Sequence, residues 1–161
     1  MNQDKFLVCT KLTLYNALAV FKRKQRVMFS LYTDGGARGN PGIAGYGCAL
    51  FDENGKLVDV DAKYLGIKTN NQAEYEGIIA GLVLVRKYGA KAVQCYLDSE
   101  LIVKQVNGEY KVRNGNIKPL FDKLVQEIKK LEEVTFSHVL RKDNKIADKL
   151  VNIAIDSSLH K

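Results

Sequence analysis

The sequence predicts an α/β fold in which helices cover a five-stranded mixed sheet. Short segments rich in β-branched and aromatic residues alternate between apolar and polar positions, as half-buried strands do. The first three such segments follow one another with only turn residues between them, which favours antiparallel pairing. The later strands alternate with helix-length amphipathic segments, which is typical of parallel strands joined by helices.

The first half of the domain contains three predicted strands and one helix. Residues 27–34 (VMFSLYTD) form the first strand. Residues 44–66 contain two more around the turn ENGK, because Asn-Gly favours a tight hairpin. The helix covers residues 69–90, and Gly89 marks its end, since glycine commonly follows a helix C-terminus.

The second half alternates between strand and helix. Its apolar positions switch from a spacing of two residues to a spacing of three to four and back again. The predicted elements are a strand at 91–98, a short helix at 99–108, a longer helix at 117–133, a strand at 134–141 and a last amphipathic helix at 142–158.

The composition is that of a globular chain with a positive charge. Of its 161 residues 46% are hydrophobic and 27% charged, with two prolines, so disorder is excluded. The formal net charge of +7 suits a polyanionic partner such as a nucleic acid. Three cysteines without a CxxC pair fit a reduced, cytoplasmic protein.

Residues 1–26 are interpreted as an N-terminal extension, partly helical and without an assigned role. The stretch FLVCTKLTLYNALAVF is apolar but is interrupted by Lys11 and Asn16, and it is too short and too polar to span a membrane. We therefore expect no membrane contact. No repeat or low-complexity linker divides the rest, so residues 27–158 are predicted to form one catalytic domain.

Two aspartates end two of the predicted strands. Side chains alternate along a strand, so Tyr32 shares a face with Asp34, and Tyr96 shares a face with Asp98. If these strands are parallel neighbours, both aspartates emerge together at their carboxyl ends. Open α/β sheets usually bind ligands at that position.

Two further acids lie on apolar faces of predicted helices. Glu74 continues the stripe formed by Ile78 and Leu82, one turn earlier. Asp148 precedes Val151 at helical spacing. Both carboxylates should therefore point inward, where a charge is costly unless it is paired or bound to a metal.

Taken singly, each acid also has an ordinary explanation: Asp34 as a turn former, Glu74 as a first-turn acid, Asp98 as an N-cap and Asp148 as a solvated residue. Together, with no evident buried basic partner, they favour a site for Mg²⁺ or Mn²⁺, which prefer oxygen ligands. Two such ions about 4 Å apart can activate a water and stabilise a leaving oxygen on phosphate.

Four blocks of the sequence resemble the type I ribonuclease H family, especially its compact archaeal-like and Bacillus-like members. They are TDGGARGNPGIAGYG, TNNQAEYEGIIAGL, LDSELIVKQVNGEYKV and HVLRKDNKIADKLVN, in that order, over roughly residues 28–157. The resemblance implies a ribonuclease H-like fold. It also implies an endoribonuclease that cuts the RNA strand of RNA–DNA hybrids with two metal ions, leaving 5′-phosphate and 3′-hydroxyl ends.

The resemblance also implies a role for each acid. Asp34 would bridge both ions, and Asp148 would bind the ion that activates water. Glu74 and Asp98 would serve the second ion, with Glu74 near the RNA 2′-hydroxyl. The substrate contacts that it implies are Gly35, Gly36, Asn40, Thr69, Asn70, Asn71, Ser99 and Glu100. Helix capping is the ordinary explanation for Thr69, Asn70 and Asn71, where we favour capping combined with contact to sugar and phosphate. An N-cap and a first-turn acid explain Ser99 and Glu100 equally well. The two glycines would let the RNA backbone approach.

The chain departs from the family's pattern in the loop before the last helix. Many members carry a histidine in the loop before the last helix, but here that connection is LRKDNK. Arg141, Lys142 and His160 are the candidates to replace it. Two alternatives stay open: a nuclease that also cuts double-stranded RNA or RNA–DNA junctions, and a non-catalytic nucleic-acid-binding module. The presence of all four acids favours an enzyme, which we expect to be a monomer.

Overall fold

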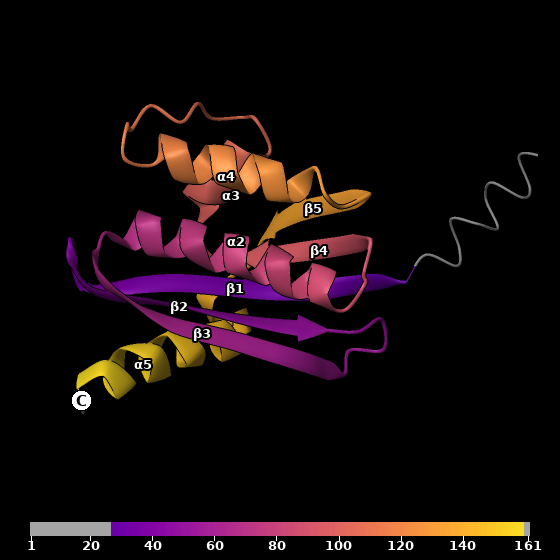
Figure 1. Cartoon of the computed structure of the whole chain (residues 1–161), viewed down its shortest axis with the longest axis horizontal. Coiled ribbons are helices and arrows are strands. Elements are labelled where there is room, and N and C mark those ends of the chain that lie inside the picture. The colour runs from indigo at the N-terminus through magenta and orange to yellow at the C-terminus, as the bar shows by residue number, and fades with distance from the viewer. Residues whose placement is uncertain (1–26, 160–161) are drawn as a thin grey trace, which may run out of the picture.

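A five-stranded sheet forms the centre of the computed structural model, which describes residues 27–159 (Figure 1). The strands are β1 (Met28–Gly39), β2 (Gly42–Phe51), β3 (Leu57–Lys68), β4 (Ala92–Leu97) and β5 (Glu133–His138). Their order is β3-β2-β1-β4-β5. The pairs β1–β2 and β2–β3 are antiparallel, whereas β1–β4 and β4–β5 are parallel. The predicted fold class is therefore confirmed. The extension assigned to residues 1–26 lies outside the described residues.

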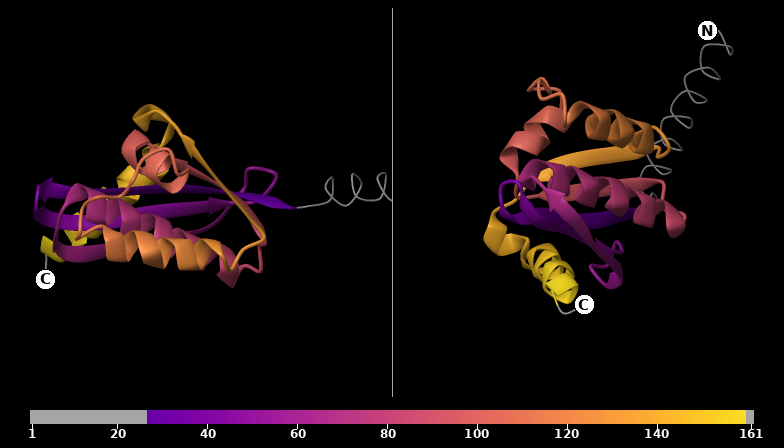
Figure 2. Two further views of the ribbon diagram at one scale, coloured as in Figure 1. Left: turned by 90° about the horizontal axis from the view of Figure 1, so that it is seen from above. Right: turned by 60° about the vertical axis from the view of Figure 1, so that its left-hand side comes forward.

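Helices cover both faces of the sheet. In Figure 1, α2, α3 and α4 lie on one side and α5 on the other, and the turned views of Figure 2 agree. The main core, which includes the fully buried Leu31, Tyr75 and Leu124, fills the space between the sheet and α2, α3 and α4. None of the helices within residues 27–159 is long and apolar enough to cross a membrane. The helices are α2 (Asn70–Lys87), α3 (Glu100–Val106), α4 (Lys118–Ile128) and α5 (Lys145–Leu159), with a short 3₁₀ helix, η1 (Arg141–Asp143), before α5.

The first strand is longer than predicted. It does not end at Asp34 but continues to Gly39, because β2 pairs with it from Ser30↔Phe51 to Gly39↔Gly42 and supplies its hydrogen-bond partners. On the other side, the parallel pairing with β4 stops at Tyr32↔Tyr96. Asp34 is therefore still paired with Gly47 of β2, but it lies beyond the last residue pair between β1 and β4.

The Asn-Gly connection between β2 and β3 forms the predicted tight hairpin. Residues 52–56 join the strands, and Gly55 has a φ of 76°. The Asp52 N–H donates to the Lys56 carbonyl oxygen and the Gly55 N–H to the Asp52 carbonyl oxygen, both at 3.0 Å. The Asp52 carboxylate also accepts hydrogen bonds from the backbone N–H groups of Asn54 and Lys56, both at 2.9 Å. Glycine in the left-handed region closes the turn, and the aspartate side chain stabilises it.

Two glycines allow the helices to press against the sheet. A Cβ atom on Gly35 would lie 2.2 Å from the backbone carbon of Ala73 in α2. A Cβ atom on Gly47 would lie 2.5 Å from Leu150 Cβ and 2.6 Å from the Ala147 carbonyl oxygen, both in α5. The side of Gly35 that a Cβ atom would occupy is therefore filled by α2. Glycine is required here because no side chain fits between sheet and helix.

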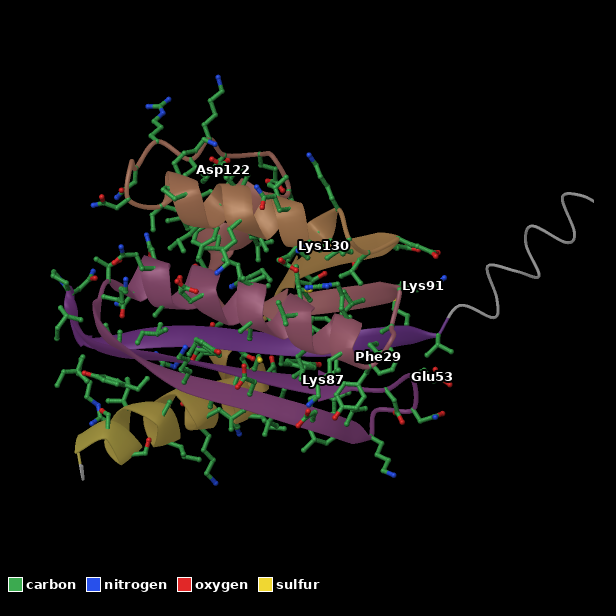
Figure 3. The ribbon with its side chains drawn as sticks, viewed as in Figure 1. Phe29, Glu53, Lys87, Lys91, Asp122 and Lys130 are labelled. Atoms are coloured by element: carbon green, nitrogen blue, oxygen red, sulfur yellow. The ribbon has the colours of Figure 1, made fainter. Side chains whose placement is uncertain are left out.

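An ion-pair cluster fastens α4 to α2. Glu127 of α4 is 7% exposed, and its carboxylate accepts hydrogen bonds from Arg86 of α2 at 2.8 Å and from Lys130 at 2.6 Å. Lys130, labelled in Figure 3, and the charge of Arg86 lower the pKa of Glu127, although burial opposes the change. The cluster holds α4 over the core and lies away from the acids described next.

Candidate active site

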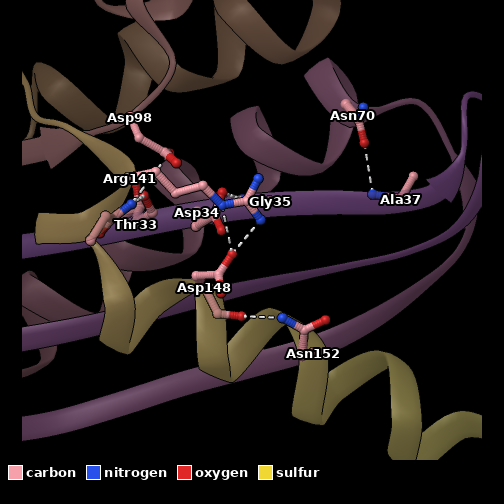
Figure 4. Close-up of polar contacts among 10 residues, drawn as sticks. Thr33, Asp34, Gly35, Ala37, Asn70, Asp98, Arg141, Asp148 and Asn152 are labelled. Atoms are coloured by element: carbon pink, nitrogen blue, oxygen red, sulfur yellow. Dashed lines mark hydrogen bonds and ion pairs between the residues drawn. The ribbon is translucent and has the colours of Figure 1, made fainter.

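Four carboxylate side chains from four parts of the fold line one cavity of about 290 Å³. Asp34 comes from β1, Glu74 from α2, Asp98 from the residue that follows β4, and Asp148 from the first turn of α5. Figure 4 shows Asp34, Asp98 and Asp148 around the side chain of Arg141. The structure thus brings together the four acids on which the sequence analysis depends.

The strand register explains why two of these acids meet. Tyr32 of β1 and Tyr96 of β4 are the last paired residues, and their rings stack with centroids 4.7 Å apart. Asp34 and Asp98 each follow their tyrosine by two residues, so both side chains lie on the same face of the sheet. The two strands are parallel neighbours, as the sequence analysis required.

Burial, together with crowded negative charge, alters the ionisation of two acids. Burial, then the charge of Asp98, raises the pKa of Asp34 to about 7, although a hydrogen bond from the Gly35 N–H opposes the change. Burial also raises the pKa of Glu74 to about 7, against a hydrogen bond with Ser99 and with the help of Asp34 and Asp98. Near neutral pH the site therefore retains protons, and a bound cation would displace them.

The structure removes three of the ordinary explanations for the acids. Asp34 lies within β1 and not in a turn. The first turn of α2 contains no acidic residue, so the helix dipole does not account for Glu74. Ser99, and not Asp98, is the N-cap residue of α3. Asp148 does lie in the first turn of α5, where its side chain is 30% exposed.

Asp148 has an exposed basic partner, whereas the sequence analysis considered only buried ones. Arg141 donates to Asp148 Oδ1 from Nε at 3.1 Å and from Nη2 at 2.5 Å. Of the candidates for the missing histidine, Arg141 is the one that lines the cavity; Lys142 is exposed and does not line it, and His160 lies outside the described residues. The sequence signal for Arg141 was a basic residue in the short turn before α5, but the sequence did not favour any one of Arg141, Lys142 and His160.

The donor types of the site fit a hard divalent cation. Four carboxylates supply oxygen ligands, and burial together with the neighbouring acids raises the pKa values of Asp34 and Glu74. Within residues 27–159, however, no group of three Asp, Glu, His or Cys side chains is arranged to hold a metal ion. Arg141 occupies one oxygen of Asp148.

The polar residues at the start of α2 form a hydrogen-bonded link to β1. Asn70 accepts from the Ala37 N–H at 2.7 Å through its side-chain oxygen (Figure 4), and its own N–H donates to Asn40 Oδ1 at 3.1 Å. Thr69 caps the helix in a capping box with Gln72. Asn70 also lines the cavity, so this link stands beside the acids.

The other predicted substrate contacts are divided between the site and its surroundings. Gly35 and Gly36 line the cavity, and Ser99 is hydrogen-bonded to Glu74. Asn71 is exposed on α2. Glu100 is exposed on α3 and pairs with Lys104 at 2.7 Å, outside the cavity lining. Direct contact of these residues with a substrate stays a prediction. Sequence reasoning missed Asn144, which is 1% exposed and contacts Asp98.

Comparison with known proteins identifies the family. The sequence model of the family described as "Reverse transcriptase-like" matches residues 32–154, which include all four acids. The ribonuclease H of Ruthia magnifica is 31% identical over 143 residues, covering 78% of this chain and 94% of that protein. A solved LC11-RNase H1 structure, in complex with an RNA/DNA hybrid, is 42% identical with a TM-score of 0.78, covering 81% of this chain and 99% of that one. The chain belongs to the type I ribonuclease H family.

Some relatives of this ribonuclease H family member are longer. The bifunctional protein Rv2228c of Mycobacterium tuberculosis is 37% identical over 126 residues, which cover 78% of this chain but 35% of that protein. The chain thus spans about a third of the length of its mycobacterial relative.

Proposed function

We propose that this ribonuclease H family member is an endoribonuclease that hydrolyses the RNA strand of RNA–DNA hybrids, leaving 5′-phosphate and 3′-hydroxyl ends. The observation that carries the proposal is the convergence of Asp34, Glu74, Asp98 and Asp148 in one open cavity. The LC11 relative, whose structure holds an RNA/DNA hybrid, supports the choice of substrate. All four acids come from one chain, so a monomer with residues 27–158 as the catalytic domain suffices. The free, buried Cys48 and Cys95 fit the reducing cytoplasm.

The proposed cofactor is a pair of Mg²⁺ or Mn²⁺ ions held by Asp34, Glu74, Asp98 and Asp148. When bound, such ions supply an activated water and stabilise the leaving oxygen of the phosphodiester. The chain itself controls the charge available to hold them. Asp34 and Glu74 must lose their protons, and both have a pKa of about 7, so cleavage should increase as the pH rises through neutrality.

The remaining groups would position the nucleic acid. The Arg141 side chain is 76% exposed at the rim of the cavity, where its guanidinium suits a phosphate. The link between Asn40 and Asn70 presents amide groups beside the cavity for contact with the sugar-phosphate backbone. Glu74 would meet the RNA 2′-hydroxyl, the group by which a protein distinguishes RNA from DNA.

The test is cleavage of one end-labelled sequence prepared as RNA–DNA hybrid, as double-stranded RNA and as double-stranded DNA, each with Mg²⁺, Mn²⁺ or EDTA. Asp34→Asn is the inactive variant. Asp122→Asn is its matched control, because Asp122 is an exposed carboxylate on α4 that does not line the cavity.

Metal-dependent cutting of the RNA strand of the hybrid, lost in Asp34→Asn and kept in Asp122→Asn, would establish the proposal. Cutting of double-stranded RNA as well would extend the substrate class. Tight hybrid binding without cutting under every metal condition would contradict the proposal and indicate a binding module.

A further inference from the structure

Asn144 is a buried amide wedged between the strands that carry the acids. Its side chain is among the largest that are fully buried, with 1% exposure. Its Nδ2 group donates to the Thr33 carbonyl oxygen at 2.9 Å and to Asp98 Oδ1 at 3.3 Å. Because both partners are acceptors, the amide must present its NH₂ group to them. Its Oδ1 atom has no hydrogen-bond partner among residues 27–159.

The position of this amide coincides with the end of a strand ladder. The backbone hydrogen bonds between β1 and β4 stop at the Tyr32↔Tyr96 pair. Just beyond that pair, Asn144 connects Thr33 of β1 to Asp98, the residue after β4. The Asn144 side chain therefore connects the two strands beyond their last backbone pair, next to Asp34 and Asp98.

Asn144 also contacts the residue before Asp34 in β1 and the first turn of α5. Thr33 immediately precedes Asp34 in the chain. The backbone carbonyl of Asn144 accepts a hydrogen bond from the Asp148 N–H at 3.1 Å, which belongs to the first turn of α5. Asn144 therefore contacts Asp98 and Asp148 directly and the neighbour of Asp34. A helix-capping role would not require both amide hydrogens to be directed at β1 and Asp98.

We propose that Asn144 is a positioning residue, which holds the Asp98 carboxylate at a set place relative to Asp34 and Asp148 and thereby prepares the acids to bind a divalent cation. The catalytic consequence rests on the proposed function. The effect on cation binding does not require cleavage to be measured, so the two ideas can fail separately.

The test compares Asn144→Ala with Asn107→Ala. Asn107 is the matched control because its side chain also donates to a backbone carbonyl, that of Phe136 at 3.4 Å, but at an exposed position away from the acids. For each full-length protein we would measure the rise in melting temperature produced by Mn²⁺, and kcat and KM for hybrid cleavage. We expect Asn144→Ala to lose most of the Mn²⁺-induced rise and about 10- to 100-fold in kcat. KM for the hybrid should stay within about twofold, because the contacts with nucleic acid are unchanged. Asn107→Ala should match the parent protein in all three.

A double-mutant cycle with Asp98→Asn tests whether Asn144 acts through Asp98. In that background, adding Asn144→Ala should cause no further loss of the Mn²⁺-induced rise, since the carboxylate it positions is gone. Additive losses would overturn the proposal, as would a normal Mn²⁺-induced rise in a folded Asn144→Ala protein or the absence of any rise in the parent.

Two outcomes need separate treatment. If Asn144→Ala does not fold, Asn144→Ser replaces it, because serine keeps a small polar side chain before α5 but lacks the amide that reaches Asp98. The same losses are expected. If the parent protein cleaves no hybrid but shows a Mn²⁺-induced rise that depends on Asn144, the positioning role stands and the proposed function fails.

Discussion

Replacing Asp34 with asparagine should make the cation-free protein more stable above pH 7, although it removes an acid that we assign to catalysis. Burial and the charge of Asp98 raise the pKa of Asp34 from 3.8 to about 7. At about 1.4 kcal/mol per pH unit, that interval corresponds to roughly 4 kcal/mol of destabilisation in the fully ionised state. Because neighbouring groups adjust, we expect a gain of about 2–4 kcal/mol in the free energy of unfolding.

The sign of the pH dependence follows from proton binding. Between about pH 4 and pH 7 the folded protein holds a proton on Asp34 that the unfolded chain has lost. This group's contribution to stability is therefore present below about pH 4 and is lost as the pH rises towards 7. Asparagine keeps an oxygen that can accept from the Gly35 N–H but carries no charge. The advantage of the variant should thus be near zero at pH 4 and greatest above pH 7.

The assay is urea unfolding followed by circular dichroism, in EDTA, at pH 4, 6 and 8. Asp122→Asn serves as the control, since its exposed carboxylate should change the free energy of unfolding by less than about 0.5 kcal/mol at each pH. Equal or lower stability of Asp34→Asn at pH 8 would refute the conclusion that the site is destabilised by crowded charge.

Three further changes test other parts of the structure. Gly47→Ala should lower the free energy of unfolding by about 2–3 kcal/mol and the melting temperature by roughly 5–10 °C. The reason is that the new Cβ atom would lie 2.5 Å from Leu150 Cβ in α5. An unchanged melting curve would contradict this packing. Glu127→Gln should cost about 1–2 kcal/mol in urea unfolding at pH 7, because it removes the ion pairs with Arg86 and Lys130. These partners hold the pKa of Glu127 below its usual value, so the difference should shrink as the pH falls through that lowered pKa and Glu127 itself becomes protonated. Arg141→Ala should reduce kcat on the hybrid at least about tenfold, while the melting temperature stays within a few degrees. Arg141→Lys should retain part of the activity. Full activity of Arg141→Ala would exclude a role for this side chain.

Local sequence patterns were sufficient to predict the secondary-structure elements, the direction of the acidic side chains and the family. The alternation of residues in β1 and β4 and the helical spacing around Glu74 and Asp148 depend on backbone geometry alone, so they predicted the elements and the inward direction of the acids. The equal spacing from tyrosine to aspartate on the two strands predicted that Asp34 and Asp98 would meet. The order of the four motif blocks was sufficient to indicate the family.

Tertiary structure alone decided how those elements are held together at the site. The extension of β1 to Gly39 depends on hydrogen bonds from β2, and the requirement for glycine at position 35 depends on how closely α2 packs. The contact of Arg141 with Asp148 depends on the turn before α5. The hydrogen bond from Asn144 to Thr33 joins residues 111 positions apart. Such contacts are created by packing and by the need to satisfy buried polar groups, and neither has a periodicity that a sequence can display.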